Sequence, residues 1–299
     1  EPTLKKGWEK ILEKAKEVGL TCSINSNGIY SPSTLDKLIE INLDEITISL
    51  DGTNENNDYL RGKGSFERAR NSIKELSSAG CRVTINTVVT SLIGEKEIKI
   101  LLGLAEEFCY DISFFYARPF GRASRIKEKL LSYEELNRFM MNVERRKDNY
   151  PKLKIRTRGS SLKINSINQS NAKDLGLIQG GSDGFTRFNI MSNGEIYAGG
   201  CVLYVDPLQK DNLLLGNIVS EEYSLLNVWR KSSLLKKIRE ESTKLAERCN
   251  KCPEYENRCG GFTLEMELYG QLNSEGNVYC KMFKKNYRFT APKRGFEKA

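Results

Sequence analysis

The chain has 299 residues, of which 39% are hydrophobic, and 47 Lys and Arg residues against 39 Asp and Glu residues give it a net charge of +8. Its length suits one large domain or two ordinary ones, and no apolar run reaches the ~18 residues that a membrane-spanning helix needs. The basic residues are mixed with acidic ones instead of forming a stripe, so we expect no nucleic-acid partner and no membrane. The absence of histidine excludes Ser-His and Cys-His catalysis and an imidazole metal ligand.

No signal-peptide pattern opens the chain, and its eight cysteines do not form the dense framework of a small secreted scaffold. We therefore expect a cytoplasmic protein with reduced thiols. Because the chain starts at Glu1-Pro2 and not at Met, we also expect it to be a fragment.

Helical and strand patterns alternate through the first half of the chain. The predicted helices span residues 8–18, begin at the N-caps Ser31 and Ser65, and lie around residues 98–108. The predicted strands span residues 20–25, 45–50, 81–90 and 112–117. Such alternation with short connections predicts an α/β fold with a parallel sheet covered by helices, either doubly wound or a barrel.

In both architectures functional groups gather at the carboxyl ends of the strands. These ends are rich in small polar side chains, glycine and arginine, and lie at residues 25–28, 49–52, 86–90 and 117–122. They suit a polar cofactor, although ordinary turns use the same residue types. No phosphate-binding glycine loop is expected, because Gly62-Lys63-Gly64 does not follow a predicted strand and no Walker A pattern occurs.

The pattern changes in the second half. Ser132 and Glu135 predict a capping box for a helix that extends to Arg146. After a Ser/Asn/Gly-rich stretch at 159–181, Ser192-Asn193-Gly194 predicts a hairpin between residues 185–190 and 195–197, and a helix is expected around 224–241. We therefore expect two domains, 1–158 and 159–299, the second a smaller α+β unit.

Four cysteines near the end of the chain have the spacing of a metal site. The C-x-x-C spacing of the first two lets both sulfurs reach one centre, and the four residues are Cys249, Cys252, Cys259 and Cys280. Thiolates serve structural zinc and iron-sulfur clusters alike, so the spacing leaves both metals open.

Several of these segments resemble the radical SAM superfamily and its SPASM subgroup. Glu1-Pro2 resembles the end of that family's Gly-Gly-Glu-Pro motif, and the other matching pieces are Ser26-Asn27-Gly28, Ser49-Leu50-Asp51-Gly52, Arg61-Gly62-x-Gly64-Ser65-Phe66 and Gly121-Arg122-Ala123. The resemblance implies a partial (β/α)6 barrel that lacks its first strands, followed by a small α+β, cysteine-rich SPASM-like domain.

The resemblance also implies a binding site for S-adenosylmethionine (SAM). The glutamate would meet the amino group of SAM, the serine and an arginine its carboxylate, and the polar neighbours its ribose or amine. The implied residues are Glu1, Asn27, Ser49, Asp51 and Arg70, with Arg68 as the alternative to Arg70.

For the metal, the resemblance favours an auxiliary 4Fe-4S cluster on the four clustered cysteines. The family's other auxiliary cluster is expected to be lost, because Gly199 and Thr263 stand where two of its cysteines belong, and Cys201 is expected to be a free thiol. The C-x-x-x-C-x-x-C loop that binds the catalytic cluster does not occur in the sequence. We therefore expect a second 4Fe-4S cluster on a missing N-terminal part, and no radical initiation by this chain alone.

The implied activity is hydrogen abstraction from a peptide or protein by a 5'-deoxyadenosyl radical, with an electron donor such as a flavodoxin or ferredoxin. Sulfatase maturation is less expected, because Val202 and not aspartate follows Cys201. Two alternatives stay open. The first is a non-catalytic binding or scaffold protein that is stabilised by zinc bound to the four cysteines. The second is a radical SAM enzyme that acts on a small molecule. No catalytic residue is predicted.

Overall fold

A computed structural model of the chain describes residues 1–117, 121–158, 184, 188–198, 214–220, 224–237 and 239–240. The chain divides into two compact units, Glu1–Gly159 and Ser160–Ala299. The predicted metal ligands Cys249, Cys252, Cys259 and Cys280 lie outside the described residues, as does Cys201.

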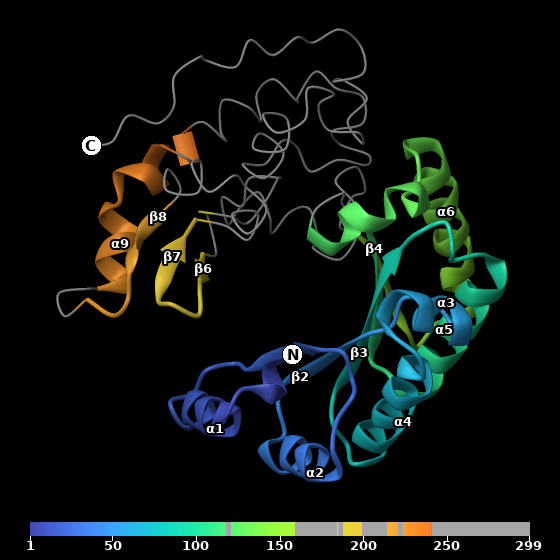
Figure 1. The fold of residues 1–299 in the computed structure, drawn as a ribbon, viewed down its shortest axis with the longest axis horizontal. Coiled ribbons are helices and arrows are strands. Elements are labelled where there is room, and N and C mark those ends of the chain that lie inside the picture. Colours follow the sequence, from blue (N-terminus) through green and yellow to red (C-terminus); the bar gives the residue numbers. More distant parts are fainter. Residues whose placement is uncertain are drawn as a thin grey trace, which may run out of the picture. The chain divides into compact units, whose positions relative to one another are not determined.

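The first unit contains a five-stranded parallel sheet (Figure 1). Its strands are β1 (Ser23–Ser26), β2 (Glu45–Ser49), β3 (Val83–Val89), β4 (Asp111–Tyr116) and β5 (Lys154–Arg158), and they lie side by side in chain order. A doubly wound sheet reverses its strand order partway, whereas a barrel does not. The α/β prediction with a parallel sheet is confirmed, and the strand order is that of a barrel segment.

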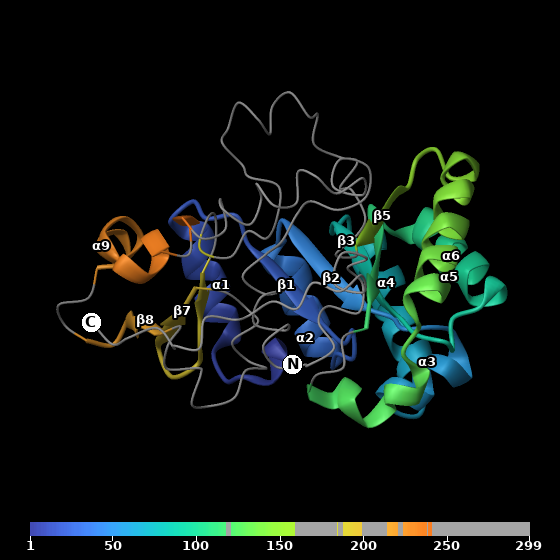
Figure 2. The same ribbon diagram turned by 90° about the horizontal axis from the view of Figure 1, so that it is seen from above.

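Helices cover the outer face of this sheet (Figures 1 and 2). The helices of the first unit are α1 (Trp8–Glu17), α2 (Pro32–Ile41), α3 (Asn54–Arg61), α4 (Ser65–Ser78), α5 (Glu95–Phe108) and α6 (Tyr133–Arg146), with short 3-10 turns at Pro2–Leu4, Gly121–Lys129 and Lys147–Asn149. The core between helices and sheet is aliphatic, and its fully buried members include Leu38, Ile46, Ile48, Ile73, Leu76, Ile85 and Leu101. Burial of this apolar surface stabilises the unit.

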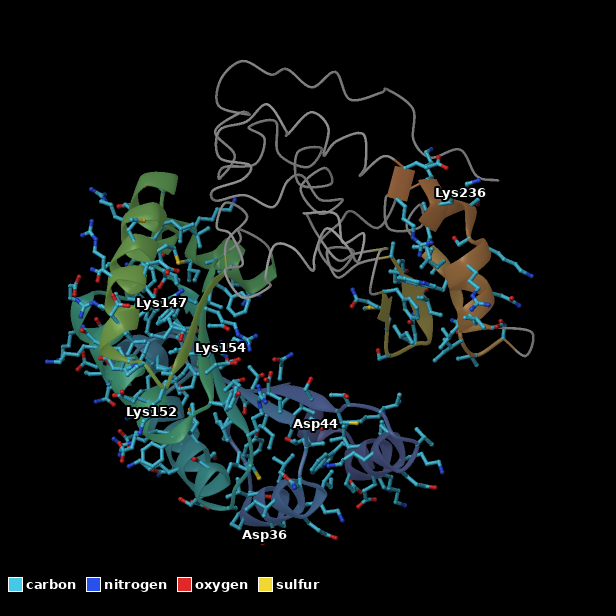
Figure 3. The ribbon with its side chains drawn as sticks, turned by 180° about the vertical axis from the view of Figure 1, so that it is seen from behind. Asp36, Asp44, Lys147, Lys152, Lys154 and Lys236 are labelled. Atoms are coloured by element: carbon cyan, nitrogen blue, oxygen red, sulfur yellow. The ribbon has the colours of Figure 1, made fainter. Side chains whose placement is uncertain are left out.

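The strand before α2 starts later than predicted. Residues 20–22 precede β1, and the side chain of Leu20 is 60% exposed. Asp44, which is labelled in Figure 3, fixes the start of the strand. Its carboxylate accepts a hydrogen bond of 2.7 Å from the Cys22 N–H, and its own N–H donates to the Cys22 carbonyl at 3.0 Å. This exchange aligns β1 with β2, whose first residue follows Asp44 directly.

The prediction that Ser65 caps α4 is wrong. Gly64 is the N-cap, in the left-handed region at φ +73°, and Ser65 is the first helical residue. The carboxylate of Asp58, from the preceding helix, accepts a hydrogen bond of 3.0 Å from the Phe66 N–H and another from the Gly64 N–H. A side chain from α3 thus replaces the local serine cap.

The described part of the second unit contains an antiparallel sheet of β6 (Asn189–Ile190), β7 (Glu195–Tyr197) and β8 (Leu214–Asn217). The hairpin predicted around Asn193-Gly194 is confirmed. The helix predicted at 224–241 is interrupted, because α9 (Leu225–Lys231) is followed by its C-cap Ser232, where ψ is 120°. The Ser232 hydroxyl then accepts a hydrogen bond of 3.3 Å from the Leu235 N–H at the start of a new helical turn.

Within the described ranges, none of the helices combines the length and the apolar character that crossing a membrane requires.

One glycine lets a strand-end loop approach the helical layer closely. Gly28 follows β1 with φ +72°, and a Cβ atom there would lie 2.7 Å from Cγ2 of Ile48 and 3.2 Å from Cβ of Ala69. Only glycine satisfies both the backbone angle and the contact. The loop after β1 is therefore pressed against β2 and α4.

We expect Gly28→Ala to destabilise the first unit by about 2–5 kcal/mol. Left-handed backbone costs a residue with a Cβ about 1–2 kcal/mol, and overpacking adds about 1–3 kcal/mol. The matched control is Gly80→Ala, because Gly80 has φ +84° but a Cβ atom added there would have no atom within 4 Å. Urea unfolding should show the larger loss for Gly28→Ala, and equal losses would contradict the close approach.

Candidate functional site

The sheet has one polar face, which is unusual for parallel strands. Ile46 and Ile48 of β2 point into the helical core, so the alternating residues Thr47 and Ser49 point to the other face. Strand register extends this face across the sheet, with Asn25 beside Thr47 and Thr84 in one row and Ser49 beside Asn86 and Ser113 in the next. Parallel sheets in α/β proteins are usually apolar on both faces. This face therefore suits a polar ligand better than a packed core.

The Glu1 carboxylate lies at the carboxyl end of β1. Its Oε1 accepts a hydrogen bond of 2.9 Å from the Ser26 hydroxyl and one of 3.0 Å from the Thr3 hydroxyl, and its Oε2 accepts one of 2.8 Å from the Asn27 N–H. The structure thus brings together two predicted site residues, Glu1 and Asn27. The Asn27 Oδ1 in turn accepts from the Ile29 N–H at 2.8 Å, which closes the turn after the strand.

At the carboxyl end of β2, Asp51 is buried and its two oxygens have different partners. Oδ1 accepts a hydrogen bond of 2.8 Å from the Val88 N–H of β3, and Oδ2 receives Nε of Arg61 at 2.7 Å and a terminal guanidinium nitrogen at 2.5 Å. Burial raises the pKa of Asp51, while the Arg61 charge and the Val88 N–H act in the opposite direction. Both oxygens of this predicted ligand are therefore already bound by protein groups.

Asn57 holds the same loop from α3. Its Oδ1 accepts a hydrogen bond of 2.8 Å from the Asp51 N–H, and its Nδ2 donates one of 2.8 Å to the Ser65 hydroxyl. The side chain is only 1% exposed, so it satisfies its polar atoms within the protein. Asn57 thus ties the end of β2 to the start of α4.

The structure does not bring Arg70 to the carboxyl end of β2. A terminal nitrogen of Arg70 pairs with Glu67 at 2.8 Å, and the side chain lines a surface cavity of about 530 Å3 between α3, α4 and α5. The alternative, Arg68, donates to the Lys63 carbonyl at 3.1 Å. Ser49 is partly exposed on the polar face, and the guanidinium near that strand end is that of Arg61.

Sequence reasoning missed the role of Arg61, although it noted the Arg61-Gly62-x-Gly64 segment. The contact between Arg61 and Asp51 joins positions ten residues apart, and the polar helix α3 lies between them. This helix was not predicted. The sequence signal that could have indicated this contact was the Asp51-Gly52 turn, followed by an arginine at the end of one short helix. Without α3, nothing in the sequence placed that arginine over the strand ends.

The three cysteines that the structure describes are free thiols. Cys22 and Cys81 are buried, and burial together with the Asp111 charge raises the pKa of Cys109 to about 12. Within the described ranges, no three cysteine, aspartate or glutamate side chains converge on a possible metal site. These thiols therefore behave as core residues.

Comparison with known proteins gives matches to both parts of the chain. The model of the radical SAM superfamily matches residues 1–105, and SPASM, an iron-sulfur cluster-binding domain, matches residues 182–253. The mycofactocin maturase MftC of Mycolicibacterium smegmatis is 27% identical over 278 residues, covering 92% of this chain and 67% of that protein. Fe-coproporphyrin III synthase of Methanosarcina barkeri is 30% identical over 138 residues, covering 45% of this chain and 34% of that protein.

Among solved structures, Streptococcus suis SuiB bound to its precursor peptide SuiA has the same fold. The TM-score is 0.66 at 23% identity, and the alignment covers 85% of this chain and 57% of the SuiB chain. The chain thus spans about two thirds of MftC and little more than half of SuiB.

We expect Asp58→Asn to lower the thermal midpoint at pH 7. The Phe66 and Gly64 N–H groups stabilise the carboxylate and lower the pKa of Asp58, so its contribution is present above the unfolded-state pKa of about 3.9 and is lost as pH falls through the lowered folded value. The difference from the unsubstituted protein should therefore shrink below about pH 4. Asp36→Asn, at an exposed position of α2, is the control. A midpoint difference that is independent of pH would contradict this role.

Proposed function

Because this chain belongs to the radical SAM superfamily and carries a SPASM domain, we propose that it is part of an enzyme that modifies a peptide or protein. SAM, when bound, supplies a 5'-deoxyadenosyl radical that abstracts a hydrogen atom from the substrate. The observation that carries the proposal is the Glu1 carboxylate, held at the carboxyl end of β1 beside a polar sheet face.

The described residues fit the amino-acid part of SAM. Glu1 is held by Ser26, Thr3 and Asn27, and its Oε2, which accepts only the Asn27 N–H, has a lone pair left for an N–H group of the SAM ammonium. An ion pair at this edge stabilises the bound cation more than it would in bulk water. Asn27 keeps its Nδ2 group for a ribose or carboxylate oxygen, because only its Oδ1 is used in the turn.

For the SAM carboxylate, Ser49 stays the predicted hydroxyl donor. Arg61 is a better candidate cation than Arg70, because Asp51 fixes it at the carboxyl ends of β2 and β3, whereas Arg70 pairs with Glu67 in the α3–α5 cavity. Asp51 then acts by orienting Arg61, since both of its oxygens are occupied. This assignment departs from the direct ligand role predicted for Asp51 and Arg70.

A peptide or protein substrate is favoured over a small molecule by the extent of the matches. The similarity to mycofactocin maturase runs through both units, whereas that to Fe-coproporphyrin III synthase covers less than half of this chain. Enzymes that act on different substrate classes would differ mainly in the second unit, since the first unit supplies the strand ends that bind SAM. A flavodoxin or ferredoxin is the proposed electron donor.

We assign an auxiliary 4Fe-4S cluster to Cys249, Cys252, Cys259 and Cys280, which supply the four thiolates such a cluster needs. Because no C-x-x-x-C-x-x-C spacing occurs in the 299 residues, the catalytic cluster is assigned to a part of the natural polypeptide outside them.

Metal analysis separates this proposal from the zinc-stabilised scaffold. The natural polypeptide that contains this sequence, purified without oxygen, should contain iron and sulfide and absorb broadly in the visible range. Cys252→Ser should remove one cluster's iron while the rest of the iron stays. Stoichiometric zinc without iron would favour the scaffold.

We expect Glu1→Gln to weaken SAM binding at least tenfold, because a charge-assisted hydrogen bond contributes about 1.5–3 kcal/mol. Isothermal titration of the anaerobic protein measures the affinity. Glu17→Gln on the exposed face of α1 is the matched control and should bind SAM normally. Unchanged affinity in Glu1→Gln would remove the main support for the site.

A further inference from the structure

Tyr30 ends the loop that surrounds the Glu1 carboxylate, and its backbone is fixed on both sides. Before it, the Ile29 N–H donates to Asn27 at 2.8 Å. After it, the Ser31 hydroxyl accepts from the Thr34 N–H at 3.2 Å and starts α2. The backbone of Tyr30 is therefore held between the turn that presents Asn27 to Glu1 and the start of α2.

The Tyr30 hydroxyl oxygen is shielded from solvent and makes no hydrogen bond of good geometry to the described residues. Ser26 and the Glu1 carboxylate lie close enough to act on its ionisation, and burial raises the pKa of Tyr30 to about 12. The phenol is therefore neutral at pH 7, with one O–H donor and an oxygen that can accept.

A buried hydroxyl without a partner destabilises a protein by about 1–3 kcal/mol, so such groups call for an explanation. Ser26 is the hydroxyl close enough to act on the phenol, but it donates to Glu1 at 2.9 Å and accepts from the Gly28 N–H at 3.0 Å, and its approach to Tyr30 does not meet hydrogen-bond geometry. A cation bound to Glu1 would place N–H donors in the same loop. An alkylammonium group has three such donors, more than one carboxylate oxygen can accept.

We propose that Tyr30 is a binding residue for SAM, whose hydroxyl oxygen accepts an N–H of the ammonium group that the Glu1 carboxylate binds. This inference rests on the proposed function and deepens it. Glu1 Oε2 and the Tyr30 hydroxyl then accept two of the three ammonium N–H groups, because Oε1 already accepts from Ser26 and Thr3. Ser26 and Asn27 fix the carboxylate, and the turn through Ile29 fixes the backbone that carries Tyr30.

The test is Tyr30→Phe in the natural polypeptide, purified without oxygen. Isothermal titration should show SAM binding weakened about tenfold, the effect of one hydrogen bond to a charged group. Binding of 5'-methylthioadenosine, which lacks the amino-acid part, should stay within twofold. The thermal midpoint without nucleotide should be unchanged or higher, because the substitution removes an unpartnered polar atom. Tyr59→Phe, at a 62% exposed tyrosine of α3, is the matched control.

Equal SAM affinity in Tyr30→Phe and the unsubstituted protein would overturn the inference while leaving the proposed function intact. A lower midpoint without nucleotide, with both nucleotides weakened alike, would also overturn it, by showing that the hydroxyl acts in folding. If the unsubstituted protein binds neither nucleotide, the proposed function itself fails.

Discussion

The candidate site depends most on the interactions of the buried Asp51 carboxylate. It joins the end of β2 to β3 through the Val88 N–H and to α3 through Arg61, while its own N–H is bound by Asn57. Removing both charges from water is costly, so the pair contributes less to stability than its short contacts suggest. Its main effect is orientation. A guanidinium tied to a buried carboxylate cannot swing away from the strand ends without leaving that charge unpaired.

The two faces of the sheet lie in different environments. The isoleucines of β2 and β3 pack under α4 and α5, whereas the intervening threonine, serine and asparagine side chains face away from the helices. The Thr47 and Thr84 hydroxyls hydrogen-bond to each other at 2.9 Å, so even the deeper row satisfies its polar atoms internally. Stability therefore comes from the helical side of the sheet, whereas on the other side Asn25, Ser49 and Asn86 are partly or fully exposed.

The sequence predicted those parts of the fold whose determinants are local. The capping box of Ser132 and Glu135 is present as expected, because its donors and acceptors lie three residues apart. The helix α3 was missed because its residues are polar and its one buried side chain, Asn57, is held by distant partners. β5 was missed because Lys154–Arg158 contains a single apolar residue, Ile155. At the site, Glu1 and Asn27 lie together as the motif implied, whereas the position of Arg61 depends on hydrogen bonds that no sequence period records.

The buried thiols of the barrel segment bear on how a cluster would be assembled. Iron-sulfur chemistry needs thiolates, and burial raises the pKa of both Cys81 and Cys109, that of Cys109 to about 12. At neutral pH these two sulfurs stay protonated, and a protonated thiol is a poor ligand for incoming iron. Metal supplied while a cluster is assembled would thus meet little competition from these two thiols.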